Sequence, residues 1–89
     1  MDNQKKIQDC KETIEVYKKE IWKLDGMVGD IKNILSYLGE CEFIEYWQYD
    51  DCVVTTRCLG FVESFLINMI EDRKTDIESE NEFIKKLSE

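Results

Sequence analysis

Apolar or semi-apolar residues recur through the first 38 residues at alternating steps of three and four. The series is Ile7, Cys10, Ile14, Tyr17, Ile21, Leu24, Val28, Ile31, Leu35 and Leu38, without a miss. This alternation is the heptad pattern of a helix with one apolar stripe. The a positions are β-branched in four of five cases, which favours two-stranded association. Residues 1–38 are therefore predicted to form a heptad helix, whose stripe Met27 and Ile34 widen near its end.

A helix of this length does not fit inside a compact domain. From Lys5 to Leu38 it would measure about 50 Å at about 1.5 Å per residue, whereas a compact domain of this size has a radius of gyration of about 12 Å. The stripe must be covered by the C-terminal half folded back on it, by a second copy of the chain, or by both. The positions expected to form the seam of a homodimer are Ile7, Ile14, Tyr17, Ile21, Leu24 and Val28.

Residues 39–51 are predicted to be an acidic and aromatic connector that begins at Gly39, a plausible end for the helix. Four of the ten aromatic residues fall between residues 43 and 49. As strands, residues 41–59 would form a β-hairpin; as a helix, they would continue into an apolar series that includes Val54, Cys58 and Phe61. Periodicity alone does not decide between the two, and the continuing series favours the helix.

Residues 52–89 are predicted to be a second helical segment that packs antiparallel on residues 28–38. Its main buried surface is expected around Phe61, Val62, Phe65, Leu66, Met69 and Ile70. The resulting fold class is all-α: one domain, residues 1–89, with a helical hairpin or small bundle that is dimeric. The alternative is an α+β fold with a short β-hairpin at about 41–59 between two helices.

The net charge of −8 lies wholly in the second half of the chain. Residues 1–38 carry seven basic and seven acidic residues, whereas residues 39–89 carry five basic and thirteen acidic ones. Such a field repels nucleic acid and anionic membranes and favours basic protein surfaces, where aromatic side chains make good anchors. The predicted partner-binding residues are Glu40, Glu42, Glu45, Tyr46, Trp47, Tyr49, Asp50, Asp51, Asp72, Asp76 and Glu80.

Two interpretations of the acidic residues stay open, imitation of nucleic acid and simple solvation. Asp72, Asp76 and Glu80 form a stripe with one charge about every 6 Å, whereas duplex DNA carries one about every 1.7 Å of its axis. One stripe is therefore several-fold too dilute for imitation without the 40–51 cluster or a second copy.

No recognisable active site is found in the sequence. The chain has no histidine, no glycine-rich phosphate loop and no nucleophile motif, so we expect no enzyme, no cofactor and no metal. The four cysteines form no C-x-x-C pair and are expected to be reduced thiols. With neither a membrane span nor the apolar core of a signal peptide, the chain is expected in the cytoplasm.

Two functions fit these features. In the first, the chain is an inhibitor that occupies a basic, nucleic-acid-handling surface of a larger protein. Its size and composition are similar in type to phage or mobile-element anti-defence proteins such as anti-CRISPR inhibitors, and to antitoxins and immunity proteins, although no motif carries the similarity. In the second, it is a structural coiled-coil homodimer or assembly subunit whose acidic surface only keeps it in solution.

Overall fold

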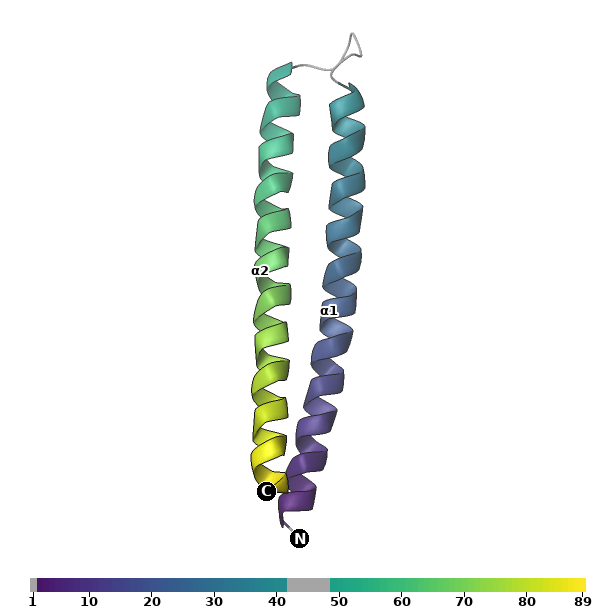
Figure 1. Cartoon of the computed structure of the whole chain (residues 1–89). Coiled ribbons are helices and arrows are strands. Elements are labelled where there is room, and N and C mark those ends of the chain that lie inside the picture. Colours follow the sequence, from purple (N-terminus) through teal and green to yellow (C-terminus); the bar gives the residue numbers. More distant parts are fainter. Residues whose placement is uncertain (1, 42–48) are drawn as a thin grey trace.

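The protein is a hairpin of two long antiparallel helices (Figure 1). The computed structural model describes residues 2–41 and 49–89, with side chains at 2–38 and 56–89. Helix α1 spans Asp2–Cys41 and α2 spans Tyr49–Ser88, 40 residues each. The hairpin measures 69 × 14 × 12 Å with a radius of gyration of 20.0 Å, so it is a rod with both termini at one end. The all-α hairpin predicted from the sequence is confirmed.

The heptad stripe of α1 faces α2 along its whole length. Six of its members are buried, each with 9% or less of its surface exposed. They are Cys10, Ile14, Leu24, Val28, Ile31 and Leu38. The remaining members, Ile7, Tyr17, Ile21 and Leu35, are half-buried. The C-terminal half of the same chain therefore covers the stripe.

Helix α2 also has a heptad series that faces α1, and this series was not predicted from the sequence. The series is Leu59, Glu63, Leu66, Ile70, Arg73, Ile77, Glu80, Ile84 and Leu87, in alternating steps of four and three. Every member is buried or half-buried. Because three of the nine are charged, the series does not stand out as an apolar pattern.

The best-packed part of the seam lies in the half of the rod nearer the connection. Leu24, Val28 and Ile31 of α1 form one buried cluster with Leu66 and Ile70 of α2. The predicted antiparallel packing of the C-terminal segment on α1 is thus confirmed, with the cluster beginning slightly earlier than residue 28.

Three residues expected in this core are exposed instead. Phe61, Val62 and Phe65 have 76%, 46% and 64% of their surface exposed. The expectation that they form the main buried surface was wrong because a helix with one neighbour buries only one stripe, and Leu59, Leu66 and Ile70 fill it.

Both helices reach further than expected into the connector. Helix α1 continues through Gly39 to Cys41, and α2 begins at Tyr49. The alternative of a β-hairpin at about 41–59 is wrong for Cys41 and for residues 49–59, which are helical. The continuing helical series from Val54 onward was the better guide. Residues 42–48 lie outside the described part of the chain.

One polar cluster joins the two helices across the seam. The Arg73 guanidinium lies with Nε 2.8 Å from Glu20 of α1 and Nη1 2.6 Å from Asp76 of its own helix. Its Cζ also lies 5.3 Å from the centre of the Tyr17 ring. The hydrogen bond to Asp76 first, and then the nearby charge of Glu20, raises the pKa of Arg73. The cluster therefore holds Arg73, a charged residue of the seam, beside Glu20 and Tyr17 of α1.

Replacing Arg73 tests this cluster. Because its partners are partly solvated, we expect Arg73→Ala to lower the free energy of unfolding modestly, through lost ion pairing, ring contact and stem packing, and by more than Lys74→Ala does. Chemical denaturation followed by circular dichroism measures the change. Lys74→Ala is the matched control, since Lys74 pairs only within α2, with Glu71. An equal effect of the two substitutions would contradict a role for Arg73 across the seam.

Three glycines inside the helices have no structural need to be glycine. A Cβ built at Gly26, Gly29 or Gly60 meets no atom within 4 Å, and none of them has a positive φ. Each therefore weakens its helix by about 0.8 to 1 kcal/mol relative to alanine.

Alanine at these positions should stabilise the hairpin. We expect Gly29→Ala and Gly60→Ala each to raise the thermal midpoint by several degrees, since about 1 kcal/mol corresponds to about 4 to 8 °C in a chain of this size. Thermal unfolding followed by circular dichroism provides the measurement. A lowered midpoint for either variant would contradict the open surroundings of these glycines.

Candidate protein-binding surface

The predicted partner-binding residues separate into two groups along the rod. Glu40 lies in the last turn of α1, and Tyr49, Asp50 and Asp51 lie in the first turn of α2, so the fold brings these four positions to one end. We call this the loop end and the opposite end the terminal end. Four more of the predicted residues fall outside the described part of the chain: Glu42, Glu45, Tyr46 and Trp47.

The second group lies far from the loop end. Asp72 is 21 residues beyond Asp51 on α2, a separation of about 30 Å along the helix. Asp72 is exposed, but Asp76 is half-buried beside Arg73, and Glu80 occupies a half-buried seam position near Cys10, where it raises the pKa of that thiol. Two of the three acids in this stripe thus have structural partners within the hairpin.

In the hairpin, the net charge is distributed unevenly along the rod. The terminal half of the rod, residues 1–23 and 70–89, carries twelve acidic and ten basic residues because the lysines of α1 lie alongside the acids of α2. Residues 24–69 carry eight acidic and only two basic residues, Lys32 and Arg57. Six of the eight net negative charges therefore belong to the half that contains the loop end.

The charges at the terminal end complement the helix dipoles, whereas those at the loop end do so only in part, since Asp50 and Asp51 in the first turn of α2 are favourable and Glu40 is not. At the terminal end, Asp2 lies in the first turn of α1 and Lys85 and Lys86 in the last turn of α2, where each complements the helix dipole. At the loop end, Glu40 lies in the last turn of α1, which contains no basic residue. An acid there opposes the dipole at a cost of about 0.3 to 1 kcal/mol. The placement of Glu40 is therefore unfavourable for the isolated helix.

A second candidate surface is apolar and runs along one flank of the hairpin. Met27 and Ile34 of α1 have 53% and 46% of their surface exposed, and on α2 Val62, Phe65 and the half-buried Met69 follow at steps of three and four. Met27 and Met69 line the same shallow groove between the helices, which places both sets on one face. We call these five residues the apolar flank.

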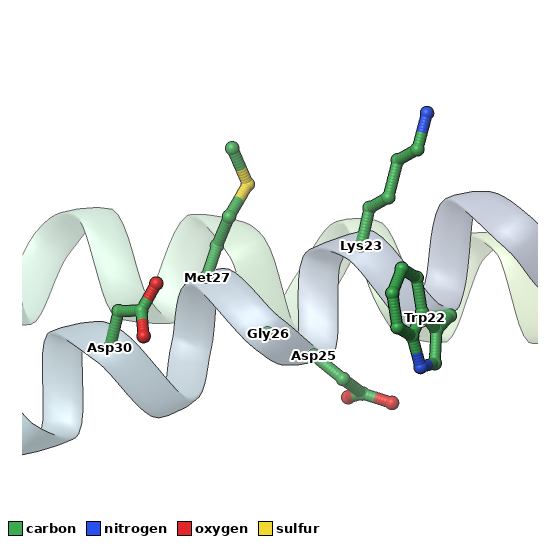
Figure 2. Close-up of a pocket in the computed structure, with 6 residues that line it drawn as sticks. All are labelled: Trp22, Lys23, Asp25, Gly26, Met27 and Asp30. Atoms are coloured by element: carbon green, nitrogen blue, oxygen red, sulfur yellow. The ribbon is translucent and has the colours of Figure 1, made fainter.

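The sides of α1 differ in character, as the close-up in Figure 2 shows. Lys23 and Met27 project from one side of the helix and Asp25 from the other, with Trp22 in front of α1 and α2 passing behind it. Trp22 is 77% exposed and borders a shallow surface hollow over Gly26. Met27 is therefore the apolar residue on the side that the flank occupies.

Sequence reasoning missed the apolar flank. The sequence pattern predicts Val62, Phe65 and Met69 in the core, and Met27 and Ile34 as a widening of the α1 stripe. The signal that identifies the flank is the α2 heptad series from Leu59 to Leu87, because Val62, Phe65 and Met69 each lie one position beside a member of it.

The residues predicted as a homodimer seam lie between the helices of a single chain. Ile14, Leu24 and Val28 are buried there, and Ile7, Tyr17 and Ile21 are half-buried. A homodimer through the same stripe would require the hairpin to open. Dimerisation through these residues stays a prediction.

Within residues 2–41 and 49–89, no group of three or more potential metal ligands comes together. None of the helices described is both long enough and apolar enough to cross a membrane. Comparison with protein-family models, with curated proteins and with solved structures gives no match. Arguments about function therefore rest on the surfaces above.

Two cysteines differ sharply in their surroundings. Cys10 is buried at the seam, where its hydrogen bond to Glu80 first, and then its burial and the nearby carboxylates, raise the pKa of its thiol. Cys58 is exposed on α2.

We expect a thiol reagent at neutral pH to modify a variant that retains only Cys58 much faster than one that retains only Cys10, because the thiolate is the reacting form. Denaturant should abolish the difference. In the Cys10 variant, Glu80→Gln should speed the reaction, since it removes the charge that disfavours the thiolate. Equal rates in the folded proteins would show that Cys10 is not held in the seam.

Proposed function

We propose that this chain is a non-catalytic, cytoplasmic protein-binding protein, an inhibitor that occupies a basic, nucleic-acid-handling surface of a larger protein through its loop end. The observation that carries the proposal is the concentration of acidic residues there. Between Lys32 and Arg57 the sequence has five acids, four aromatic residues in positions 43–49 and no base. The hairpin presents the ends of both flanking helices at one tip of the rod.

The position of Glu40 supports a binding role over simple solvation. Acids that only keep a protein in solution can lie anywhere on its surface, including sites where they stabilise a helix. Glu40 instead opposes the dipole of α1 in a turn with no compensating base. Residues that break a local stability rule in this way are expected at functional sites.

The charge density around the loop end limits the kind of binding that we propose. Residues 24–69 carry a net charge of −6 over about 27 Å of the rod, whereas duplex DNA of that length carries about 16 charges. The loop end is therefore too dilute to reproduce a phosphate backbone. We propose that its charge steers the chain to a basic surface and that aromatic and apolar side chains supply most of the affinity. Anti-defence, antitoxin and immunity proteins are the classes that such a mode of action suggests.

The test is capture of the partner by wild-type and charge-reversed proteins. A pull-down from host lysate at low and high salt, with mass spectrometry of the eluate, should recover a nucleic-acid enzyme that is lost at high salt. Adding the purified chain should then reduce nucleic-acid binding by that enzyme. We expect Glu40→Lys, Glu42→Lys and Glu45→Lys together to weaken the complex at least tenfold at low salt, about 1.4 kcal/mol or more.

The matched control changes the charge by the same amount at the terminal end. Glu78, Glu82 and Glu89 are all exposed, so their replacement by lysine leaves the seam intact. Equal loss of capture by both triple variants would show that the interaction depends only on overall charge, and it would refute a specific site at the loop end. Recovery of nothing but a second copy of the chain would favour the structural alternative, a homodimer or assembly subunit without inhibitory role.

A further inference from the structure

The two helices keep one register along the seam. Glu20 lies beside Arg73, so each step forward along α1 from residue 20 is matched by a step back along α2 from residue 73. By this count residue 35 is level with residue 58, and Leu35 and the adjacent Leu59 both pack against the buried cluster. The ion pair and the apolar cluster therefore report the same register.

Helix α1 presents the same side to α2 at every heptad. Its seam stays closed as far as Leu38, which at 5% has the least exposed surface among the buried residues of that helix. A straight helix would drift by about 20° per heptad from a seven-residue repeat, and the burial of Leu38 at its heptad position shows that α1 keeps the repeat. Positions separated by whole heptads are therefore equivalent across the seam.

Cys41 and Cys52 hold the heptad places of Glu20 and Arg73. Position 41 is 21 residues beyond Glu20, and position 52 is 21 residues before Arg73, which is three whole heptads in each case. Cys41 is the last residue of α1, and Cys52 lies in the first turn of α2. The backbone thus places these two cysteines level with each other, at the pair of positions through which Glu20 and Arg73 meet.

In the two helices no other two cysteines share a level. Cys10 lies 31 residues before Cys41, about 46 Å along α1, and Cys58 lies six residues beyond Cys52, about 9 Å along α2. A disulfide joins Cα atoms that are no more than about 7 Å apart. Every pairing that involves Cys10 or Cys58 exceeds this limit, which leaves only Cys41 with Cys52.

Small residues occupy the helices near this level. Gly39 comes two residues before Cys41 on α1, and Thr56 is the α2 seam position between Cys52 and Leu59. Thr56 is exposed, so no bulky buried side chain separates the helices at that position. The distance between packed helices depends on the side chains at the contact, and small ones permit close approach. The composition of this end therefore suits a covalent link between the helices.

We infer that Cys41 and Cys52 are a redox-active pair that forms an intramolecular disulfide across the loop end when the chain meets an oxidising small-molecule disulfide such as oxidised glutathione. One thiolate attacks that disulfide and releases a first glutathione, and the second cysteine then displaces the other. The new Sγ–Sγ bond replaces the S–S bond of oxidised glutathione. Two electrons pass to glutathione, and the protons of the two cysteine thiols end on its two thiols. In a reducing compartment the dithiol is the resting form and the disulfide is transient.

This pair goes beyond the proposed function and does not depend on it. The disulfide closes a ring of residues 41–52, which includes Tyr49, Asp50 and Asp51 of the predicted binding surface. Its formation is measured on the purified chain without a partner. Failure of the thiol pair and failure of partner capture are therefore distinguishable.

The first experiment identifies the linkage. The wild-type chain is equilibrated with oxidised and reduced glutathione, its remaining thiols are alkylated, and it is digested with trypsin and a glutamate-specific protease. Cleavage after Glu42, Glu45 and Arg57 separates Cys41, Cys52 and Cys58 unless a disulfide joins them. We expect the peptides of Cys41 and Cys52 to be linked, with Cys10 and Cys58 alkylated. Linkage through Cys10 or Cys58, or between two chains, overturns the proposal.

The second experiment tests whether the hairpin brings the pair together. The equilibrium constant for forming the disulfide against glutathione should be at least tenfold larger in the folded chain than in denaturant, because only folding holds the two positions level. Cys52→Val with Val53→Cys is the matched control, since it keeps the composition and moves the thiol by about 100° around α2. The ratio in this control should fall to near one. A ratio near one in the wild type, or equal ratios in the two chains, refutes the placement.

The third experiment measures the effect of the disulfide on stability. By linkage, a tenfold preference for the folded chain corresponds to about 1.4 kcal/mol, which raises the thermal midpoint by about 6 to 11 °C in a chain of this size. Circular dichroism of the oxidised and reduced wild type measures this shift. Cys52→Ala retains the other three cysteines and should show no shift with the same oxidant. Equal midpoints for the two forms of the wild type, or the same shift in Cys52→Ala, would contradict the pair.

Discussion

A helix with a single neighbour buries a single stripe, and this limit governs the whole hairpin. Each residue of α1 or α2 either lies in the seam or faces solvent, because residues 2–41 and 49–89 form the two helices and no second layer over them. The seam takes Leu24, Val28 and Ile31 from α1 and Leu66 and Ile70 from α2. Large apolar residues beyond that stripe, such as Phe61 and Phe65, have no place inside the molecule. The surface of the protein is consequently more apolar than its composition requires.

Charged residues within the seam favour one alignment of the two helices. An apolar heptad seam alone permits shifts of one heptad at modest cost, because one aliphatic layer resembles the next. Arg73 disfavours such shifts, since its guanidinium pairs with Glu20 and lies near the Tyr17 ring only at one level of α1. Glu80 acts similarly on the buried thiol of Cys10, nearer the terminal end. The strongest apolar packing and these polar contacts therefore occupy different parts of the rod, the first giving stability and the second the register.

The sequence predicted the first helix and the hairpin because the α1 stripe is apolar at every heptad position. It did not predict the α2 seam, where Glu63, Arg73 and Glu80 interrupt the pattern. In this segment the density of apolar residues predicts burial less well than their periodicity does. The density wrongly predicts that Phe61, Val62 and Phe65 are buried. The same misassignment concealed the apolar flank. For the acidic residues, sequence spacing grouped Asp72, Asp76 and Glu80 with the loop end, and only the fold shows that the first of them lies about 30 Å away along α2.

The acidic charge and the exposed apolar residues lie in the same half of the molecule, and this coincidence has a physical consequence. An exposed apolar flank favours association with any apolar surface, which is a liability for a protein that must stay in solution. A net charge of −6 over the same half opposes association with other acidic proteins. Basic surfaces avoid that repulsion. Charge therefore restricts which contacts the apolar residues make, so that specificity and affinity come from different side chains of one narrow rod.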